Sequence, residues 1–220
     1  MAEVKADRRR YRSPVREEAA LRTRRAVVTA AAELFAERGY TASSLREVAD
    51  AAGVARPTVA AAFGSKPALL RQVVDEALAG DDGPVSVADR PWFAPVWQAE
   101  QPSAVLAAYA EVCTLIGRRA AWIFEVVHRA AADSSEIGEL WTTLVRNRRL
   151  GAQMVLRRAR ETGPLRPDLA EGHAVDALWV LNDPALYGSL VRDRGWSEDQ
   201  YRRWLAAQMQ AAVLPAAPGR

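Results

Sequence analysis

The sequence is poor in the residues that most often carry chemistry, with one cysteine and two histidines among its 220 residues. The single cysteine, Cys113, cannot form a disulfide within the chain, and its helical surroundings favour a small core side chain. No segment approaches the run of about 18 apolar residues that a membrane-spanning helix needs. The charged N-terminal stretch has no apolar stretch behind it, so it does not resemble a signal peptide. We therefore expect a soluble, cytoplasmic protein.

The sequence motifs of several enzyme classes are missing as well. The chain has no His-Glu-x-x-His pair, no glycine-rich phosphate loop and no Gly-x-Ser-x-Gly turn. Glu125 and His128 have the spacing of half a di-iron carboxylate site, but such a site needs a second pair, and His173 has no such partner. We expect no enzymatic activity, no metal and no cofactor.

Positive charge is unevenly distributed along the chain, although the net charge is only +3. Residues 1–78 carry 14 basic and 10 acidic side chains, whereas residues 79–220 carry 16 and 17. Within the first 25 residues, nine basic side chains stand against four acidic ones. Positive charge gathered at one end indicates a polyanionic partner. A solubilising basic tail is the alternative interpretation.

Apolar residues recur with helical spacing along nearly the whole chain, and no convincing alternating strand pattern is present. The expected fold class is therefore all-α. Ser44 followed by Glu47 predicts a capping box, and Gly53 predicts a tight turn. Pro57 and Ser65 predict the starts of two further helices. The expected helices cover about 17–38, 44–53, 57–63, 65–78, 103–115, 117–132, 136–161, 168–182, 184–193 and 197–213.

Residues 44–63 form two short helices joined by a turn of about four residues. This is the helix-turn-helix arrangement, whose second helix enters the major groove of DNA. The stretch 25–78 resembles the DNA-binding domain of the tetracycline-repressor (TetR) family. The resemblance is carried by AAELFAERGY at 31–40, Thr41, Ser44, VADAAGV at 48–54, Pro57-Thr58-Val59, Phe63, Ser65-Lys66 and ALL at 68–70.

The resemblance implies a dimeric, all-helical transcription regulator, usually a repressor, that binds a palindromic operator and is released by a small molecule. It implies an N-terminal three-helix helix-turn-helix domain and a larger C-terminal ligand-binding and dimerisation domain. The turn-rich run 79–91 fits a boundary between them. We expect a basic flexible arm over residues 1–16, the DNA-binding domain over 17–78 and the C-terminal domain over 92–214.

The resemblance also implies which residues contact DNA. Ser44 and Arg46, at the start of the second helix, are expected to meet phosphates, as is Lys66 at the start of the fourth. Arg56 can make a bidentate contact to guanine, and Thr58 can hydrogen-bond a base or a phosphate. The expected recognition-helix positions are Ala55, Arg56, Pro57, Thr58, Ala60, Ala61 and Ala62.

The recognition helix departs from the family pattern at Ala60 and Ala62. The family usually has an aromatic residue at the first position and an aromatic residue or histidine at the second. Alanine can only contact a thymine methyl group or let the helix lie deeper in the groove. We expect the arginine-rich residues 8–12 to replace the lost grip on the phosphates.

The C-terminal half contains all seven tryptophans. Large aromatic residues between helices either line a ligand cavity or fill a core. Arg148 could hold an anionic ligand, reach the surface along its apolar stem, or pair with an acid such as Glu125. The candidate ligand-binding residues are Trp97, Tyr109, Trp122, Glu125, His128, Trp141 and Arg148.

The last helices are the candidates for dimerisation, through an isologous two-fold interface. The alternative is a DNA-binding regulator whose C-terminal half is a dimerisation scaffold without a small-molecule ligand. The expected contact stripes are Ala170, Ala174, Ala177, Leu178 and Leu181, followed by Tyr201, Trp204, Leu205, Gln208 and Ala212.

Overall fold

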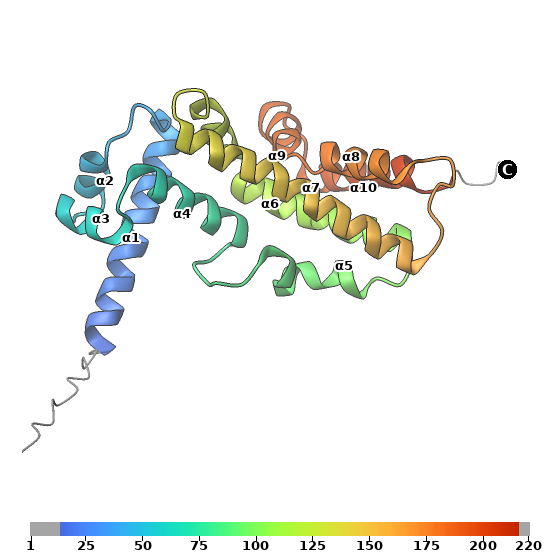
Figure 1. The fold of residues 1–220 in the computed structure, drawn as a ribbon, viewed down its shortest axis with the longest axis horizontal. Helices are drawn as coiled ribbons and strands as arrows, with labels where there is room; N and C mark the ends of the chain where they lie inside the picture. Colours follow the sequence, from blue (N-terminus) through green and yellow to red (C-terminus); the bar gives the residue numbers. More distant parts are fainter. Residues whose placement is uncertain (1–13, 216–220) are drawn as a thin grey trace, which may run out of the picture.

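The computed structural model describes residues 14–215, and every regular element within this range is helical (Figure 1). The expected all-α fold class is confirmed. None of the described helices is both long and apolar enough to cross a membrane. The elements are α1 (Pro14–Arg38), α2 (Leu45–Ala51), α3 (Arg56–Phe63), α4 (Lys66–Ala79), two 3-10 turns (Val87–Asp89 and Pro91–Phe93), α5 (Ala94–Gln98), α6 (Pro102–Ala130), α7 (Ser135–Thr162), α8 (Glu171–Leu181), α9 (Pro184–Tyr187), a π-helical turn (Gly188–Asp193) and α10 (Glu198–Val213).

Local sequence signals determine where the helices of the helix-turn-helix begin. Ser44 caps α2 and forms the predicted capping box with Glu47. The Ser65 hydroxyl oxygen accepts a hydrogen bond from the Ala68 backbone N–H at 3.2 Å and so caps α4. Gly53 lies between α2 and α3 with a φ of 66°, a conformation that glycine adopts without strain. These devices fix where α2, α3 and α4 begin and therefore how α3 is presented.

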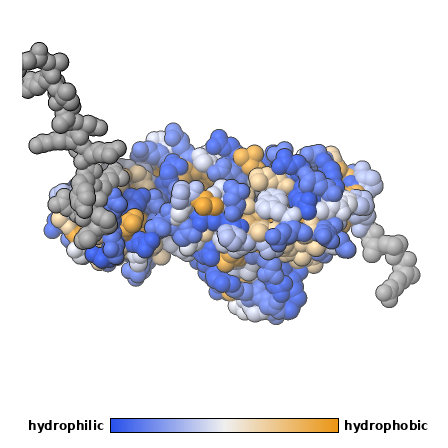
Figure 2. Space-filling view, turned by 90° about the horizontal axis from the view of Figure 1, so that it is seen from below, coloured by the Kyte–Doolittle hydropathy of each residue, from blue (hydrophilic) through white to orange (hydrophobic). Residues whose placement is uncertain are grey.

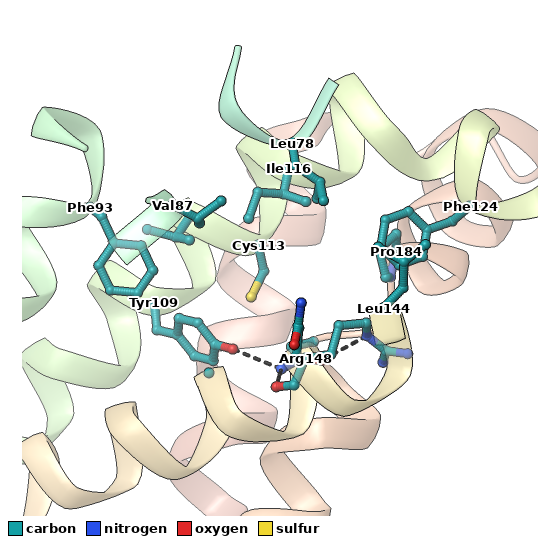
Figure 3. Close-up of a pocket in the computed structure, with 14 residues that line it drawn as sticks. Leu78, Val87, Phe93, Tyr109, Cys113, Ile116, Phe124, Leu144, Arg148 and Pro184 are labelled. Atoms are coloured by element: carbon teal, nitrogen blue, oxygen red, sulfur yellow. Dashed lines mark hydrogen bonds between the residues drawn. The ribbon is translucent and has the colours of Figure 1, made fainter. Parts of the chain in front are cut away.

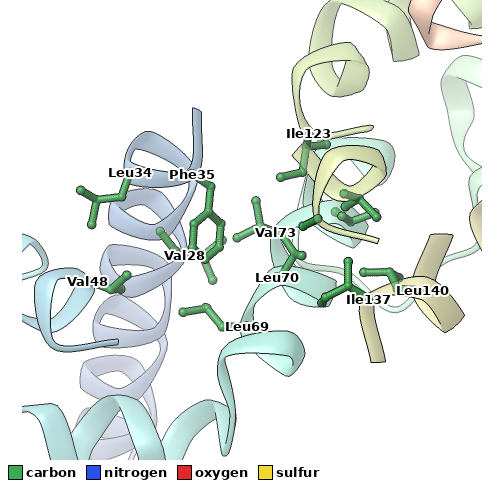
Figure 4. Packing of buried hydrophobic residues seen from close by; sticks show 14 of the residues in the cluster. Val28, Leu34, Phe35, Val48, Leu69, Leu70, Val73, Ile123, Ile137 and Leu140 are labelled. Atoms are coloured by element: carbon green, nitrogen blue, oxygen red, sulfur yellow. The ribbon is translucent and has the colours of Figure 1, made fainter. Parts of the chain in front are cut away.

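The hydrophobic core of the N-terminal helices continues into the C-terminal half (Figure 4). Phe35 of α1, Val48 of α2 and Leu70 of α4 are buried on the N-terminal side. Ile123 of α6 and Ile137 of α7 belong to the same cluster, so α4 packs between the two halves. A continuous core of this kind transmits a shift of one packed helix to its neighbours.

The C-terminal half is built on α6 and α7, which pack side by side along the molecule (Figure 1). Helices α8 and α10 pack against them and against each other at the end far from α1–α4. This arrangement buries a second hydrophobic cluster. Its fully buried large side chains are Leu106, Leu156, Leu178, Tyr201, Leu205 and Met209.

The prediction of two separate helices over 103–115 and 117–132 is wrong, because α6 runs without a break from Pro102 to Ala130. The reason for the glycine is contact with α9. A Cβ atom built on Gly117 would lie 2.6 Å from the Cβ and Cγ atoms of Tyr187. Gly117 therefore allows Tyr187 to approach the helix backbone instead of ending the helix.

The other boundary predictions differ by a few residues. Helix α1 begins at Pro14 and thus includes the last three residues of the predicted arm, while residues 1–13 lie outside the described range. Helix α8 begins at Glu171 and not at 168, and the short α5 was not predicted. The predicted helix 184–193 begins correctly at Pro184 but passes into a π-helical turn after Tyr187.

The predicted dimerisation stripes are only partly exposed. Leu178, Tyr201 and Leu205 are at most 1% exposed and belong to the chain's own core, so their assignment to a partner-facing surface is wrong. The helical period was correct, but each stripe mixed inward-facing and outward-facing positions. The opposite side of the same helices is exposed, and it includes Val180 at 55%. Figure 2 shows one mainly hydrophilic face of the molecule with hydrophobic residues in small separate patches.

Candidate DNA-binding surface and ligand cavity

Helix α3 presents a nearly continuous exposed surface. It rests on the core through Val59, which is 1% exposed, and through the half-buried Phe63. Small side chains dominate the exposed side, so a flat partner can approach the helix backbone closely. The exposed residues are the seven that the sequence predicted: Ala55, Arg56, Pro57, Thr58, Ala60, Ala61 and Ala62.

Arg56 is the only long charged side chain on this surface of α3. It is exposed and has neither an ion-pair nor a hydrogen-bond partner among the described residues. Its five N–H donors are therefore free for a bidentate contact. Arg46, by comparison, lies 3.9 Å from Asp50 in an exposed pair across one turn of α2, which contributes little to stability.

The donors of Ser44 are already occupied. The Glu47 carboxylate accepts hydrogen bonds from the Ser44 backbone N–H at 2.9 Å and from its hydroxyl at 2.8 Å. These bonds hold the pKa of the Glu47 carboxyl below its ordinary value, with smaller contributions from Arg38 and Lys66. A phosphate at this position would have to displace a carboxylate. The predicted phosphate contact of Ser44 stays a prediction.

Lys66 is held at the start of α4 by an aromatic ring. Its ammonium group lies 4.1 Å from the centre of the Tyr40 ring, a cation–π contact. Burial lowers the pKa of Lys66, and the neighbouring Glu47 opposes that shift. The side chain is half-buried, so its charge is placed by the protein before any partner arrives.

Arg24 has a structural role that no local sequence pattern indicates. This α1 side chain donates to the Ala62 carbonyl oxygen at 3.1 Å and to Oε1 of Gln72 at 2.6 Å. Its guanidinium also lies 4.5 Å from the centre of the Phe63 ring. Arg24 thus ties the last turn of α3 to both α1 and α4.

A cavity of about 300 Å³ lies among α4, α6, α7 and the turn after α8 (Figure 3). Two of the predicted ligand-binding residues, Tyr109 and Arg148, line it. Leu78, from the last turn of α4, also lines it and thereby connects the cavity to the N-terminal half. The remaining lining residues are Val87, Phe93, Val112, Cys113, Ile116, Phe124, Leu144, Asn147, Gly151, Asn182 and Pro184.

Asn182 joins the polar groups of the cavity. Its side-chain N–H donates to the Tyr109 hydroxyl at 2.7 Å and to the Arg148 carbonyl oxygen at 3.1 Å. Its side-chain oxygen accepts from Nε of Arg148 at 3.1 Å. Asp183, next in the chain, caps α9 by accepting from the Ala185 N–H at 2.9 Å. The break between α8 and α9 is thus where the polar wall of the cavity is made.

Three other predicted ligand-binding residues line a separate hollow. The His128 ring stacks on Trp141 with 4.6 Å between ring centres. Glu125, beside them, pairs with Arg129 at 2.5 Å and with Arg192 at 3.7 Å. Glu125 therefore does not pair with Arg148. Within residues 14–215, no group of three or more potential ligands is placed to hold a metal ion.

The two remaining candidates serve packing. The Trp97 indole N–H donates to the Ala88 carbonyl oxygen at 2.9 Å, and its ring stacks on Phe93. The Trp122 indole N–H donates to the Arg119 carbonyl oxygen, and its ring borders a shallow groove beside α1 and α4. The seven residues predicted as one ligand site therefore lie in four places.

The helix-turn-helix region matches a known family model. Residues 27–73, from the middle of α1 to the middle of α4, match the model described as bacterial regulatory proteins, tetR family. This segment of the chain is similar to the TetR family. The TetR match covers all of α2 and α3, the two helices of the helix-turn-helix.

Solved structures extend the TetR-like fold to nearly the whole chain. The SmeT–triclosan complex is 21% identical with a TM-score of 0.68, and it covers 90% of this chain and 96% of its own. A Saccharomonospora viridis protein in complex with choline is 20% identical, with a TM-score of 0.68 and coverages of 90% and 99%. NalD, the secondary repressor of the MexAB-OprM multidrug efflux pump in Pseudomonas aeruginosa, is 21% identical, with a TM-score of 0.66 and coverages of 90% and 100%. No curated protein sequence matches.

Proposed function

We propose that this protein is a TetR-type transcriptional repressor that binds a palindromic operator as a homodimer in the cytoplasm. A small molecule bound in the C-terminal cavity releases it from DNA. The observation that carries the proposal is the position of α4. Its last turn contributes Leu78 to the cavity wall, and its middle contributes Gln72 to the Arg24 bridge that holds α3.

DNA binding is supported by the surface of α3. The unpaired guanidinium of Arg56 is suited to guanine O6 and N7, and Thr58 lies exposed beside it. Ala60 and Ala62 offer contacts to thymine methyl groups and no hydrogen bonds. Sequence preference is therefore concentrated at the N-terminal end of the helix.

Phosphate binding is supported by the positive groups around α3. Lys66, held over Tyr40, and Arg46, paired only loosely, both lie at helix starts. The start of a helix carries partial positive charge that favours phosphate, and α4 has 14 residues. The arginine-rich residues 8–12 lie outside the described residues, and their contribution to DNA binding stays a prediction.

Release by a small molecule is supported by the chain of contacts through α4. A molecule that fills the cavity contacts Leu78, and the packed core around α4 resists local compression. A displacement of α4 changes the position of Gln72 relative to Arg24 and hence of the last turn of α3. Two proteins with this fold were solved with small molecules, triclosan and choline.

Dimerisation is supported by the exposed sides of the late helices. Val180 of α8 is 55% exposed and Leu150 of α7 is 50% exposed, although both are large apolar residues. Two such residues on helices that pack together favour burial against a second copy. A two-fold dimer would place two α3 helices on a DNA site with two inverted halves.

The test of ligand control joins two measurements on the full chain. Thermal-shift screening first finds small molecules that stabilise the protein. Each is then titrated into a complex with DNA selected from a random pool, followed by fluorescence anisotropy. Because linkage is reciprocal, a molecule that weakens DNA binding must bind less tightly to the DNA complex. If every stabilising molecule leaves DNA affinity unchanged, the C-terminal half is a dimerisation scaffold and release by a ligand is wrong.

A further inference from the structure

The chemistry of the cavity restricts what it can bind. Its volume of about 300 Å³ is at the lower end of the range for small-molecule pockets, roughly 300–1,000 Å³. Apolar side chains form most of the wall, among them Phe93, Ile116 and Leu144. The polar groups are confined to one side, where α7 meets the turn after α8 (Figure 3). A bound molecule is therefore mainly apolar with one polar end.

Arg148 is the single charged residue of the wall, and each of its three guanidinium nitrogens already has a partner within the protein. Nε donates to Asn182 at 3.1 Å, one terminal nitrogen donates to the Trp179 carbonyl oxygen at 2.9 Å, and the other lies 2.9 Å from the Asp183 carboxylate. The side chain is 10% exposed. An anionic molecule would have to compete with Asp183 for the same guanidinium and bring a second negative charge beside it. The structure therefore disfavours Arg148 as an anion-binding residue.

The other titratable groups of the wall are neutral. Burial raises the pKa of the Tyr109 hydroxyl well above its ordinary value. Burial also raises the pKa of the Cys113 thiol to about 12. Because the charge of Arg148 is balanced by Asp183, the cavity wall carries no net charge. A charged molecule would therefore lose its hydration in the cavity without compensation.

Tyr109 supplies the one directed donor of the cavity. Its oxygen accepts from Asn182, so its own proton points elsewhere. The partner of that proton within the described residues is the Cys113 sulfur, a weak acceptor that an oxygen acceptor of a ligand can replace. Asn147 also lines the cavity, but it is exposed, so its amide is open to solvent and is not directed by the protein.

We propose that the cavity binds an uncharged, largely apolar small molecule whose single hydrogen-bond acceptor takes the proton of Tyr109. This inference rests on the proposed function in that the same cavity is the effector site. The Arg148–Asp183 pair disfavours carboxylates, and the absence of a carboxylate from the described cavity wall disfavours ammonium compounds.

The test uses four compounds of one shape: 2-acetylnaphthalene, 2-ethylnaphthalene, 2-naphthoate and 2-naphthylmethylammonium. Isothermal titration calorimetry measures each with the full chain and without DNA. We expect the ketone to bind at least ten-fold more tightly than either charged compound. Tyr109→Phe keeps the ring, so it should weaken binding of the ketone about five- to ten-fold without changing the affinity for 2-ethylnaphthalene. Tyr187→Phe removes a hydroxyl outside the cavity, so it should change the affinity for neither compound.

A second variant tests the exclusion of anions. Asp183→Asn keeps an acceptor for Arg148 and a cap for α9 but removes the balancing charge. We expect this variant to bind 2-naphthoate at least ten-fold more tightly than wild type does. Its melting temperature shows whether the chain is folded. The proposal is overturned if wild type binds 2-naphthoate or the ammonium compound as tightly as the ketone. It is also overturned if none of the four binds, or if Tyr109→Phe weakens both neutral compounds equally.

These outcomes separate the inference from the proposed function. Binding of the ketone through Tyr109 with no effect on DNA affinity would support the cavity chemistry and contradict its role as the effector site. Tight binding of 2-naphthoate that releases DNA would support the effector site and contradict the inference.

Discussion

Arg24 donates a hydrogen bond to the carbonyl oxygen of Ala62 at 3.1 Å, so α1 holds the last turn of α3. The same guanidinium lies over Phe63 and bonds to Gln72 of α4. Three helices therefore meet at one side chain. The orientation of α3 depends on this contact and not only on the turn at Gly53.

Removing Arg24 should weaken DNA binding without removing any DNA contact. Arg24→Ala loses two hydrogen bonds and a cation–π contact, which together correspond to about 1–3 kcal/mol of unfolding free energy. Chemical denaturation measures that loss, and fluorescence anisotropy measures DNA affinity. Arg22→Ala is the matched control, because Arg22 carries the same charge on the same helix and is 72% exposed. Equal losses of DNA affinity in both variants would show that charge alone, and not the position of α3, is involved.

Arg56 and Lys66 should have different effects on DNA binding. Arg56→Ala should cost about 1–3 kcal/mol at one base position and relax the preference there. Lys66→Met keeps the apolar stem over Tyr40 but removes the charge. It should therefore weaken binding to all DNA sequences alike and reduce the slope of log affinity against log salt concentration by about one. Anisotropy titrations at several salt concentrations, on the preferred DNA and on scrambled DNA, distinguish these results. If both variants weaken the two DNAs equally, the division between base reading and phosphate binding is wrong.

Gly117→Ala should destabilise the protein. The new methyl group would lie 2.6 Å from carbon atoms of Tyr187, and relieving the overlap should cost about 1–3 kcal/mol of unfolding free energy. Gly172→Ala is the control, because a Cβ atom there meets nothing within 4 Å in another helix. That variant should gain up to about 1 kcal/mol from helix propensity. A stable Gly117→Ala protein would show that α9 does not pack on α6 as described.

The capping box should make stability depend on pH. Hydrogen bonds from Ser44 hold the pKa of Glu47 below its ordinary value of 4.5. A carboxyl whose pKa is lowered in the folded state stabilises that state above its unfolded pKa, and the contribution disappears as pH falls through the folded pKa. The stability difference between wild type and Glu47→Gln should therefore shrink below about pH 4.5. The exposed Glu37→Gln is the control, and a difference that stays constant with pH would contradict the assignment.

The sequence predicts the N-terminal half well because its signals are local. The capping serine at Ser44, the turn at Gly53 and the cap at Ser65 each act within four residues, and all three are present. The helix break predicted just before Gly117 is wrong, and the reason for this glycine lies 70 residues away in Tyr187. A glycine that admits a neighbouring side chain cannot be distinguished by local sequence from one that ends a helix.

The cavity was harder to predict for a related reason. Tyr109 and Arg148 were identified, but Asn182, which joins them, was part of a break with no evident physical role in the sequence. The tryptophans misled because their size suits both a core and a cavity, and Trp97 and Trp122 satisfy their N–H groups on nearby backbone. Polar groups from α6, α7 and the turn after α8 converge only in the folded chain.

The central claim is that α3 reads DNA as part of a two-fold dimer. Selection of DNA from a random pool by the full chain tests it most directly, with Arg56→Ala run in parallel. We expect wild type to enrich one sequence with two inverted half-sites, each with a fixed guanine that Arg56→Ala no longer selects. No enrichment by wild type, a single asymmetric site, or the same guanine retained by Arg56→Ala would contradict it.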